Sequence, residues 1–293
     1  MINRKLEYTA DEGTHPKLGV DWADEKRPFF QHLGELRRRV IVCAVAIITG
    51  MAISYFFYDA LILNLLRGPL DVLSGKEGNP FAVNNPLLTL LKSSNPQLEK
   101  LDLDLHYIGP LEAFLVKLKA SFYAGFVLAS PVLFYQLWKF ISVGLKKKER
   151  RAILFYFPVS ILLFLTGISF AYLIMLPTGL YFLIAVAGGS LKPMLTISQY
   201  TSLVILLSLV FGIVFELPLV VLFLTKIGIV SPELLAEKRK YAFIGIFIVS
   251  ALFTPPDVFT QLMMGIPGII LYEVSIWLSR VASKRRKRAL ELT

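Results

Sequence analysis

The chain has 293 residues, of which 55% are hydrophobic and only 18% are charged. Soluble domains carry about a quarter charged residues, so this chain lacks the polar surface that a water-soluble globule needs. Disorder is excluded by the same values, which leave an integral membrane protein with several helical spans.

The cysteine and histidine content bounds the chemistry. A single cysteine, Cys43, excludes an internal disulfide framework and a cysteine-based metal site. The three histidines, His15, His32 and His106, are too scattered to form a cluster on one helix. We therefore expect no metal and no cofactor.

The chain opens with a polar segment of mixed charge, residues 1–28, which we expect to be a disordered tail that becomes helical near Phe29. The first span follows at 40–58, a run of 19 residues without a charge, long enough for one hydrocarbon thickness. Residues 67–110 are rich in Pro, Asn, Gly and charge. They predict a long loop with a short helix near 85–92.

Five further spans complete an expected membrane domain over residues 29–280, at 120–140, 152–176, 200–225, 241–254 and 259–279. We expect Pro177 to end the third span. The span at 241–254 is short for a bilayer. A proline-rich turn, Thr254-Pro255-Pro256-Asp257, joins it to the last span, and a basic tail, 281–293, closes the chain.

Lysine and arginine predict the orientation. The expected loops on one side, 1–39, 139–151, 226–240 and 280–293, hold 24 of the 31 Lys and Arg residues. By the positive-inside rule that side is cytoplasmic, so both termini are expected there. The net charge of +10 is then a topology signal, not a sign of nucleic-acid binding, and the tail at 284–288 can contact anionic lipid.

Four of the expected spans contain an interior proline: Pro131, Pro158, Pro218 and Pro267. Proline removes a backbone donor and kinks a helix. Two interpretations remain open from this pattern: a curved scaffold with a concave face, or kinks of the kind that are common in membrane helices.

Two expected cytoplasmic segments each hold a carboxylate among cations. Glu35 lies one helical turn from Arg38 and Arg39, and Glu149 precedes Arg150 and Arg151. An ordinary ion pair within the helix, or an anchor for the positive side, would explain each segment. The alternative is a site for a peptide with two cations, one for each carboxylate.

Two more acids lie inside expected spans. Glu216 is deep in the fourth span, where a charge is costly and the side chain must face protein or water. It is a functional candidate or a structural partner beside Pro218. Glu273, near the cytoplasmic end of the last span, favours snorkelling or pairing with another helix.

Catalytic motifs do not appear in the sequence: it contains no HExxH, GxSxG, P-loop or Rossmann glycine pattern. We therefore do not expect an enzyme. A secondary transporter that uses Glu216 as a proton site remains an alternative, although the sequence shows no inverted repeat of the kind common in such proteins.

An ordered set of short motifs resembles the TatC family, the multi-span receptor subunit of the twin-arginine protein translocase. These motifs are His32-Leu33-x-Glu35-Leu36-Arg37, Gly68-Pro69-Leu70, Glu112-x-Phe114, Pro131-x4-Gln136-x-Trp138-x-Phe140, Glu149-Arg150-Arg151, Phe215-Glu216-Leu217-Pro218, Thr254-Pro255-Pro256-Asp257 and Leu271-Tyr272-Glu273. The resemblance covers roughly residues 29–280.

The resemblance implies an all-α, glove-shaped protein with six spans in the bacterial cytoplasmic membrane. It implies a receptor for folded precursors whose signal peptide carries two adjacent arginines, with transport driven by the proton-motive force. Single-span TatA and TatB subunits, and further copies of the chain, are the implied partners.

By motif match, the signal-peptide-binding residues are Glu35, Glu149 and Phe140, supported by Arg37, Arg150 and Arg151. The buried polar site in the fourth span matches Glu216, and Glu273 is a second intramembrane acid. Structural or partner-contact roles fall on the remaining matched residues, which are Pro69, Glu112, Phe114, Pro218 and Asp257.

Overall fold

The computed structural model describes residues 22–75, 79–81, 86–94, 103–143, 147–187 and 194–291. Its elements in chain order are α1 (Trp22–Phe56), the π-helix η1 (Tyr58–Ile62), α2 (Leu63–Ser74), α3 (Pro86–Ser94), β1 (Leu105–His106), α4 (Pro110–Val143), α5 (Lys147–Phe170), the π-helix η3 (Ala171–Met175), α6 (Leu176–Ala187), β2 (Leu195–Thr196), α7 (Ile197–Phe215), α8 (Leu217–Ile227), α9 (Pro232–Glu237), α10 (Arg239–Phe253) and α11 (Val258–Glu291). Helix α1 thus begins at Trp22, before the expected Phe29. Residues 1–21 of the expected tail lie outside the described part.

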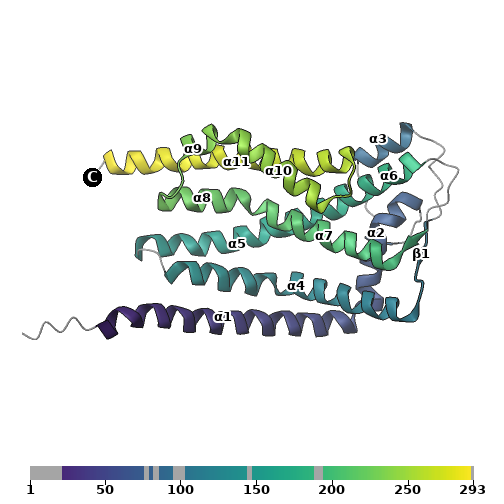
Figure 1. Ribbon diagram of the computed structural model, residues 1–293, viewed down its shortest axis with the longest axis horizontal. Helices are drawn as coiled ribbons and strands as arrows, with labels where there is room; N and C mark the ends of the chain where they lie inside the picture. Colours follow the sequence, from purple (N-terminus) through teal and green to yellow (C-terminus); the bar gives the residue numbers. More distant parts are fainter. Residues whose placement is uncertain are drawn as a thin grey trace, which may run out of the picture.

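The long helices lie side by side, with α1, α4, α5, the pair α7 and α8, and the pair α10 and α11 following one another across the molecule (Figure 1). One end of the molecule contains the first residues of α1 and α5 and the last residues of α4, α8 and α11. We call it the Glu35 end. Both ends of the described chain lie there. Helices α2 and α3, both strands and the turn at 254–257 lie at the other end, which we call the Pro69 end.

Five helical segments are long and apolar enough to cross a membrane: Gly34–Phe56, Pro110–Ser142, Tyr156–Val186, Ile197–Ile227 and Val258–Lys284. They correspond to five of the six expected spans. The remaining expected span, 241–254, corresponds to helix α10, which has 15 residues and is shorter than these segments. The protein is therefore a mostly helical, multi-pass membrane protein, and a sixth crossing stays a prediction.

A two-stranded parallel sheet at the Pro69 end was not predicted from the sequence. Leu105 of β1 pairs with Leu195 of β2, and His106 pairs with Thr196. Each strand has only two residues, too few to show an alternating pattern of hydrophobicity. The sheet joins the segment before α4 to the segment before α7.

The expected end of the third span at Pro177 is wrong, because the helix continues to Ala187. Pro177 is the second residue of α6, and the π-helix η3 precedes it directly. The backbone N–H of Leu176 bonds to the carbonyl of Ala171 in the wider π turn. Such a turn changes the hydrogen-bond register, which lets the helix accommodate a proline that cannot donate.

The expected long loop from residue 67 is also partly wrong, because helix α2 extends to Ser74 with Pro69 inside it. Pro69 cannot donate to the carbonyl four residues earlier, which belongs to Leu65. The hydroxyl of Tyr172 donates to that carbonyl at 2.6 Å, and the hydroxyl of Tyr200 donates to the next one, Leu66, at 2.6 Å. Tertiary hydrogen bonds thus replace the bond that the proline removes.

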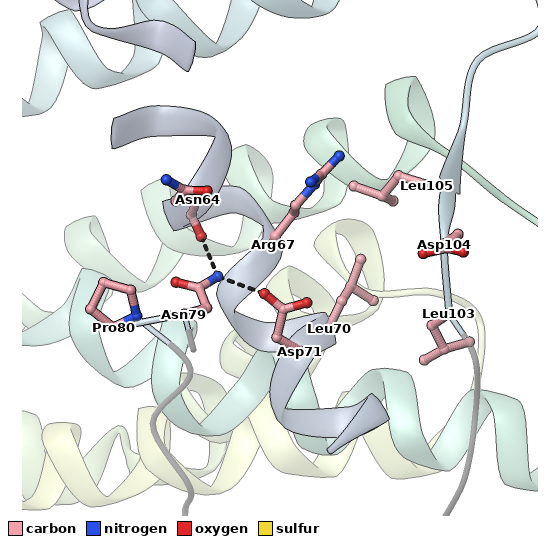
Figure 2. Close-up of a pocket in the computed structure, with 9 residues that line it drawn as sticks. All are labelled: Asn64, Arg67, Leu70, Asp71, Asn79, Pro80, Leu103, Asp104 and Leu105. Atoms are coloured by element: carbon pink, nitrogen blue, oxygen red, sulfur yellow. Dashed lines mark hydrogen bonds between the residues drawn. The ribbon is translucent and has the colours of Figure 1, made fainter. Parts of the chain in front are cut away.

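Helix α2 and the segment at 103–105 border a cleft of about 490 Å³ (Figure 2). Asn79 closes one side, because its amide donates to the Asn64 carbonyl at 2.9 Å and to the Asp71 carboxylate at 2.6 Å. Arg67 extends from α2 in the same cleft (Figure 2). These contacts hold the segment after α2 against the helix.

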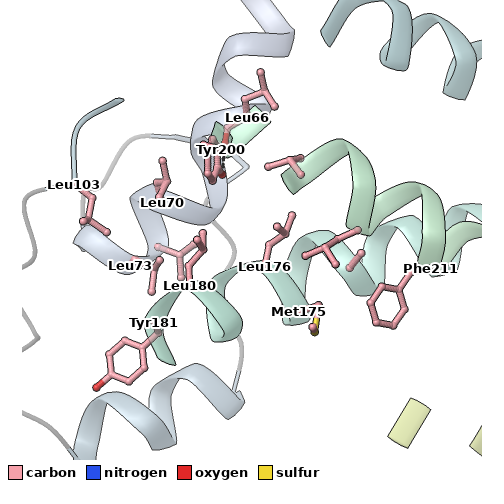
Figure 3. Close-up of a cluster of buried hydrophobic side chains, with 14 of the residues drawn as sticks. Leu66, Leu70, Leu73, Leu103, Met175, Leu176, Leu180, Tyr181, Tyr200 and Phe211 are labelled. Atoms are coloured by element: carbon pink, nitrogen blue, oxygen red, sulfur yellow. Dashed lines mark hydrogen bonds between the residues drawn. The ribbon is translucent and has the colours of Figure 1, made fainter. Parts of the chain in front are cut away.

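The main hydrophobic cluster lies at the Pro69 end (Figure 3). Leu70 and Leu73 of α2 pack against Leu180 of α6, and all three side chains are buried. Tyr181 belongs to the same cluster and donates its hydroxyl to the Leu91 carbonyl of α3 at 3.1 Å. The short helices α2, α3 and α6 therefore form one packed unit with the ends of the long helices.

Candidate functional site

Close packing between α1 and α4 sets which residues of the two helices lie opposite each other at the Glu35 end. A Cβ atom on Gly50 of α1 would lie 2.6 Å from the carbonyl oxygen of Gly125 on α4, so the two backbones touch. Arg39 is 11 residues before Gly50, and its partner Gln136 is 11 residues after Gly125. One further turn of the antiparallel pair brings Glu35 level with Phe140.

Glu35 forms an ion pair with Arg39, four residues later on the same helix. The Glu35 side chain remains 39% exposed, whereas Arg39 is buried, with 7% of the residue exposed. Arg39 also donates from Nη1 to the backbone carbonyl of Gln136 at 3.4 Å, which links α1 to α4. Glu35 is thus accessible from outside, and its partner is held between the helices.

The other predicted carboxylate, Glu149, lies in the first turn of α5, together with Arg150 and Arg151. The backbone of this turn is at the Glu35 end, beside the end of α4 (Figure 1). The side chains of these three residues lie outside the described part of the chain. The structure therefore brings the backbone of Glu149 to the same end as Glu35 and Phe140 and leaves the predicted side-chain site untested.

Next to this end, three aromatic rings pack between α4, α5 and α8. The Trp138 and Tyr156 rings are stacked with centroids 5.1 Å apart, and Phe223 meets Trp138 edge to face at 5.3 Å. Lys226 lies over the Tyr156 ring at 5.0 Å. Trp138 is two residues before Phe140, so this cluster fixes the last turns of α4. Tyr156 and Phe223 were not identified from the sequence.

Glu216 lies where the helix breaks between α7 and α8. It is the residue between the two helices, and Pro218 follows in the first turn of α8. Its carboxyl oxygen Oε1 is buried and has no hydrogen-bond partner among the described residues. The break in the fourth span therefore carries an acid with one buried oxygen that has no partner in the described structure.

Glu273 of α11 pairs with Arg239 of α10 at 2.8 Å, so of the two expected alternatives, snorkelling or pairing with another helix, the structure shows the pairing. The neighbouring Tyr272 donates its hydroxyl to the Leu235 carbonyl of α9 at 2.8 Å. These contacts tie three helices together at the Glu35 end. The identity of the partner could not be inferred from local spacing, because Arg239 lies 34 residues from Glu273.

Arg37 is exposed on α1, two residues after Glu35, whereas Pro69, Glu112, Phe114 and Asp257 belong to the Pro69 end. The Glu112 carboxylate accepts hydrogen bonds from the backbone N–H of Ile108 at 2.7 Å and of Ser198 at 3.3 Å. Asp257 caps α11, since its carboxylate accepts the N–H of Thr260 at 2.7 Å. Phe114 is about half exposed on α4. Glu112 and Asp257 thus have structural contacts, and neither lies near Glu35.

In the part of the chain that the structure describes, no group of three or more His, Cys, Asp or Glu side chains could hold a metal ion. The chemistry of the Glu35 end is that of an accessible carboxylate, a buried guanidinium and aromatic surfaces. Such groups bind cationic and apolar ligands.

Comparison with protein families gives one match over most of the chain. The family model described as Sec-independent protein translocase protein (TatC) matches residues 31–267. A curated TatC from Desulforapulum autotrophicum is 39% identical over 263 residues, which cover 90% of this chain and 88% of that protein. A TatC from Aquifex aeolicus is 37% identical over 262 residues, covering 89% of this chain and 98% of that protein.

Solved structures give the same match. A crystal structure of the twin-arginine translocase receptor TatC superimposes with a TM-score of 0.68 and 35% sequence identity, covering 86% of this chain and 99% of that one. A second crystal structure of that receptor, in the detergent DDM, gives a TM-score of 0.68 and 36% identity over 85% of this chain and 99% of that one.

Proposed function

Because this chain belongs to the TatC family, a component of the Sec-independent protein translocase, we propose that it is the receptor for twin-arginine signal peptides. The observation that supports this role most directly is the arrangement at the Glu35 end. An exposed carboxylate there lies level with Phe140, and the helix that carries Glu149 begins beside them.

The chemistry of this end suits a pair of arginines. A guanidinium is planar and presents a fork of donors that a carboxylate accepts in a bidentate manner, whereas a lysine ammonium is a point charge. Each partly shielded pair would contribute on the order of 1–3 kcal/mol. In the proposed complex, Glu35 and Glu149 each accept one arginine, and Phe140 offers an apolar surface beside them. Arg37, Arg150 and Arg151 would repel peptides that bring positive charge without this fit.

The proposed orientation places the Glu35 end in the cytoplasm of a bacterial cell and the Pro69 end outside. The excess of lysine and arginine in the loops of the Glu35 end supports this orientation. A sixth crossing by α10 would bring both termini to the same side. The outer face of α10 supports the crossing, because Tyr241, Ile244, Ile248 and Leu252 are each more than half exposed and spaced as one stripe.

The expected partners of a translocase core follow from the same family. We propose that the chain recruits single-span subunits of the TatA and TatB type and further copies of itself, and that the complex uses the proton-motive force to export folded proteins. Apolar side chains cover the outward faces of α1, α10 and α11, which are available to lipid or to partner helices. The role proposed for Glu216 is as a polar contact at the break in the fourth span, in place of the solute transport that it suggested on its own.

The proposal is tested by binding of a synthetic signal peptide with adjacent arginines and an apolar segment to the full-length protein in detergent. Glu35→Gln and Glu149→Gln should each weaken binding by about tenfold, because each removes one charged pair. Glu233→Gln, an exposed glutamate at the same end, is the matched control and should leave affinity unchanged. A Lys-Lys peptide should bind the wild-type protein weakly. Unchanged affinity in both variants and in their double variant would overturn the site.

A further inference from the structure

Arg39 is a buried cation beside an exposed binding carboxylate. Only 7% of the residue is exposed, and its guanidinium pairs with Glu35. Its remaining contact in the described structure is the 3.4 Å hydrogen bond from Nη1 to the Gln136 carbonyl. Nε is buried and has no hydrogen-bond partner among the described residues. Glu35 is thus the one carboxylate seen to neutralise this guanidinium.

A protein that leaves a buried charge without its partner is strongly destabilised. An incoming guanidinium that takes the Glu35 carboxylate would leave Arg39 either unpaired or sharing that carboxylate with a second cation. Both outcomes oppose binding. The group already bound to Glu35 is also chemically the same as the group proposed to arrive, a guanidinium.

We infer that Arg39 is an internal competitor for Glu35, which occupies the carboxylate in the empty receptor and lowers the affinity of every cationic peptide that binds there. This inference rests on the proposed function of the Glu35 end. The competitor sets a threshold, because a peptide must replace an existing ion pair and not merely supply positive charge.

The opposite role would be positioning, in which Arg39 holds Glu35 in the conformation that binds the peptide. The two roles predict effects of opposite sign. Removing a competitor frees the carboxylate and strengthens binding, whereas removing a positioning residue weakens it. The competitor also subtracts the same free energy from every cationic ligand, so its removal should leave the preference for Arg-Arg over Lys-Lys unchanged.

The test compares Arg39→Gln with wild type, using the full-length protein in detergent and synthetic peptides with Arg-Arg or Lys-Lys before the same apolar segment. Glutamine removes the charge but ends two bonds short of the guanidinium nitrogens, so it also loses the hydrogen bond to the Gln136 carbonyl, and thermal unfolding must show that α1 stays packed on α4. Affinity should rise about five- to tenfold for both peptides, as expected for loss of one partly shielded ion pair. Arg38→Gln removes the same charge from an exposed neighbouring position and should change affinity less than twofold.

A double-mutant cycle isolates the pair. In a Glu35→Gln background, Arg39→Gln should give no more gain than Arg38→Gln, because no carboxylate remains to be freed. Weaker binding by Arg39→Gln in the otherwise wild-type protein, with unchanged thermal stability, would overturn the competitor role in favour of positioning. So would a gain equal to that of Arg38→Gln, which would mean that only net charge matters.

Failure of the proposed function has a separate signature. If Glu35→Gln alone leaves binding of the Arg-Arg peptide unchanged, Glu35 is not part of the site, and the competitor role falls with it. If Glu35→Gln weakens binding while Arg39→Gln fails to strengthen it, the receptor site stands and only the inference about Arg39 is refuted. Thermal unfolding of each variant checks that α1 still packs on α4.

Discussion

The contact between Gly50 and Gly125 gives the most direct test of how α1 is held. Replacing Gly50 with alanine places a Cβ atom 2.6 Å from the Gly125 carbonyl oxygen, whereas ordinary contacts begin at 3.4 Å. The obstacle is backbone, so it cannot rotate away, and α1 must move outward by about 0.8 Å in a densely packed interface. Overpacking of this kind costs about 1–3 kcal/mol.

Alanine also favours the helix over glycine, by about 0.8–1 kcal/mol, so the net destabilisation of Gly50→Ala relative to wild type should be about 0–2 kcal/mol. Relative to a control that gains the same helix propensity without the clash, the loss should be the full amount of about 1–3 kcal/mol. The control is Gly245→Ala in α10, where an added Cβ meets no atom within 4 Å. It carries the same change in helix propensity without the clash and should keep or raise the stability.

Thermal unfolding of the purified protein in detergent, followed by tryptophan fluorescence, measures both variants. Relative to Gly245→Ala, Gly50→Ala should lower the Tm by about 2–12 °C, given that a domain of this size loses roughly 2–4 °C for each kcal/mol. Gly245→Ala should not lower it. Equal Tm values for the two variants would refute the close approach of α1 and α4, and with it the register that brings Glu35 level with Phe140.

Two further predictions concern contacts of α11. Asp257→Ala removes the side chain that accepts the Thr260 N–H and should lower the stability by about 1 kcal/mol, measured as a lower Tm. Asp257→Asn keeps a capping oxygen and should lower the stability less. Equal losses of stability in the two variants would argue against the cap. Arg239→Gln and Glu273→Gln should each destabilise the protein. Their double-mutant cycle should give a coupling free energy of about 0.5–1 kcal/mol, because the ion pair is partly exposed. Additive effects of the two substitutions would show that the ion pair contributes nothing to stability.

The sequence predicted the features that depend on one helix alone. Long, mostly apolar runs located five membrane segments, because a span must be apolar over about 20 residues wherever it lies in the bundle. The spacing of Glu35 from Arg38 and Arg39 made an ion pair within the helix one of the two expected alternatives, and the structure forms it with Arg39, since residues four apart face each other on a helix. The effect of prolines was harder to predict, because a proline indicates a missing hydrogen-bond donor and does not show how the structure compensates for it.

Pro69 and Pro177 show this limit. Pro69 was expected in a loop, yet helix α2 continues through it because the hydroxyl of Tyr172 replaces the missing donor from 107 residues away. Pro177 was expected to end a span, yet a π turn directly before it carries the helix onward. Both outcomes depend on tertiary contacts or on a change of helix register, which local patterns do not encode.

The two ends of the molecule differ in how they are held, and the difference fits a receptor. At the Pro69 end, side chains from distant helices bond to backbone groups of α2, α3 and α7, so this end is fixed by contacts between segments far apart in the chain. At the Glu35 end, α1 is anchored through Arg39 to α4, and only 17% of its span is buried. A helix held this way on one side keeps its other faces accessible. The carboxylate it carries can therefore meet a peptide while the rest of the bundle keeps its position.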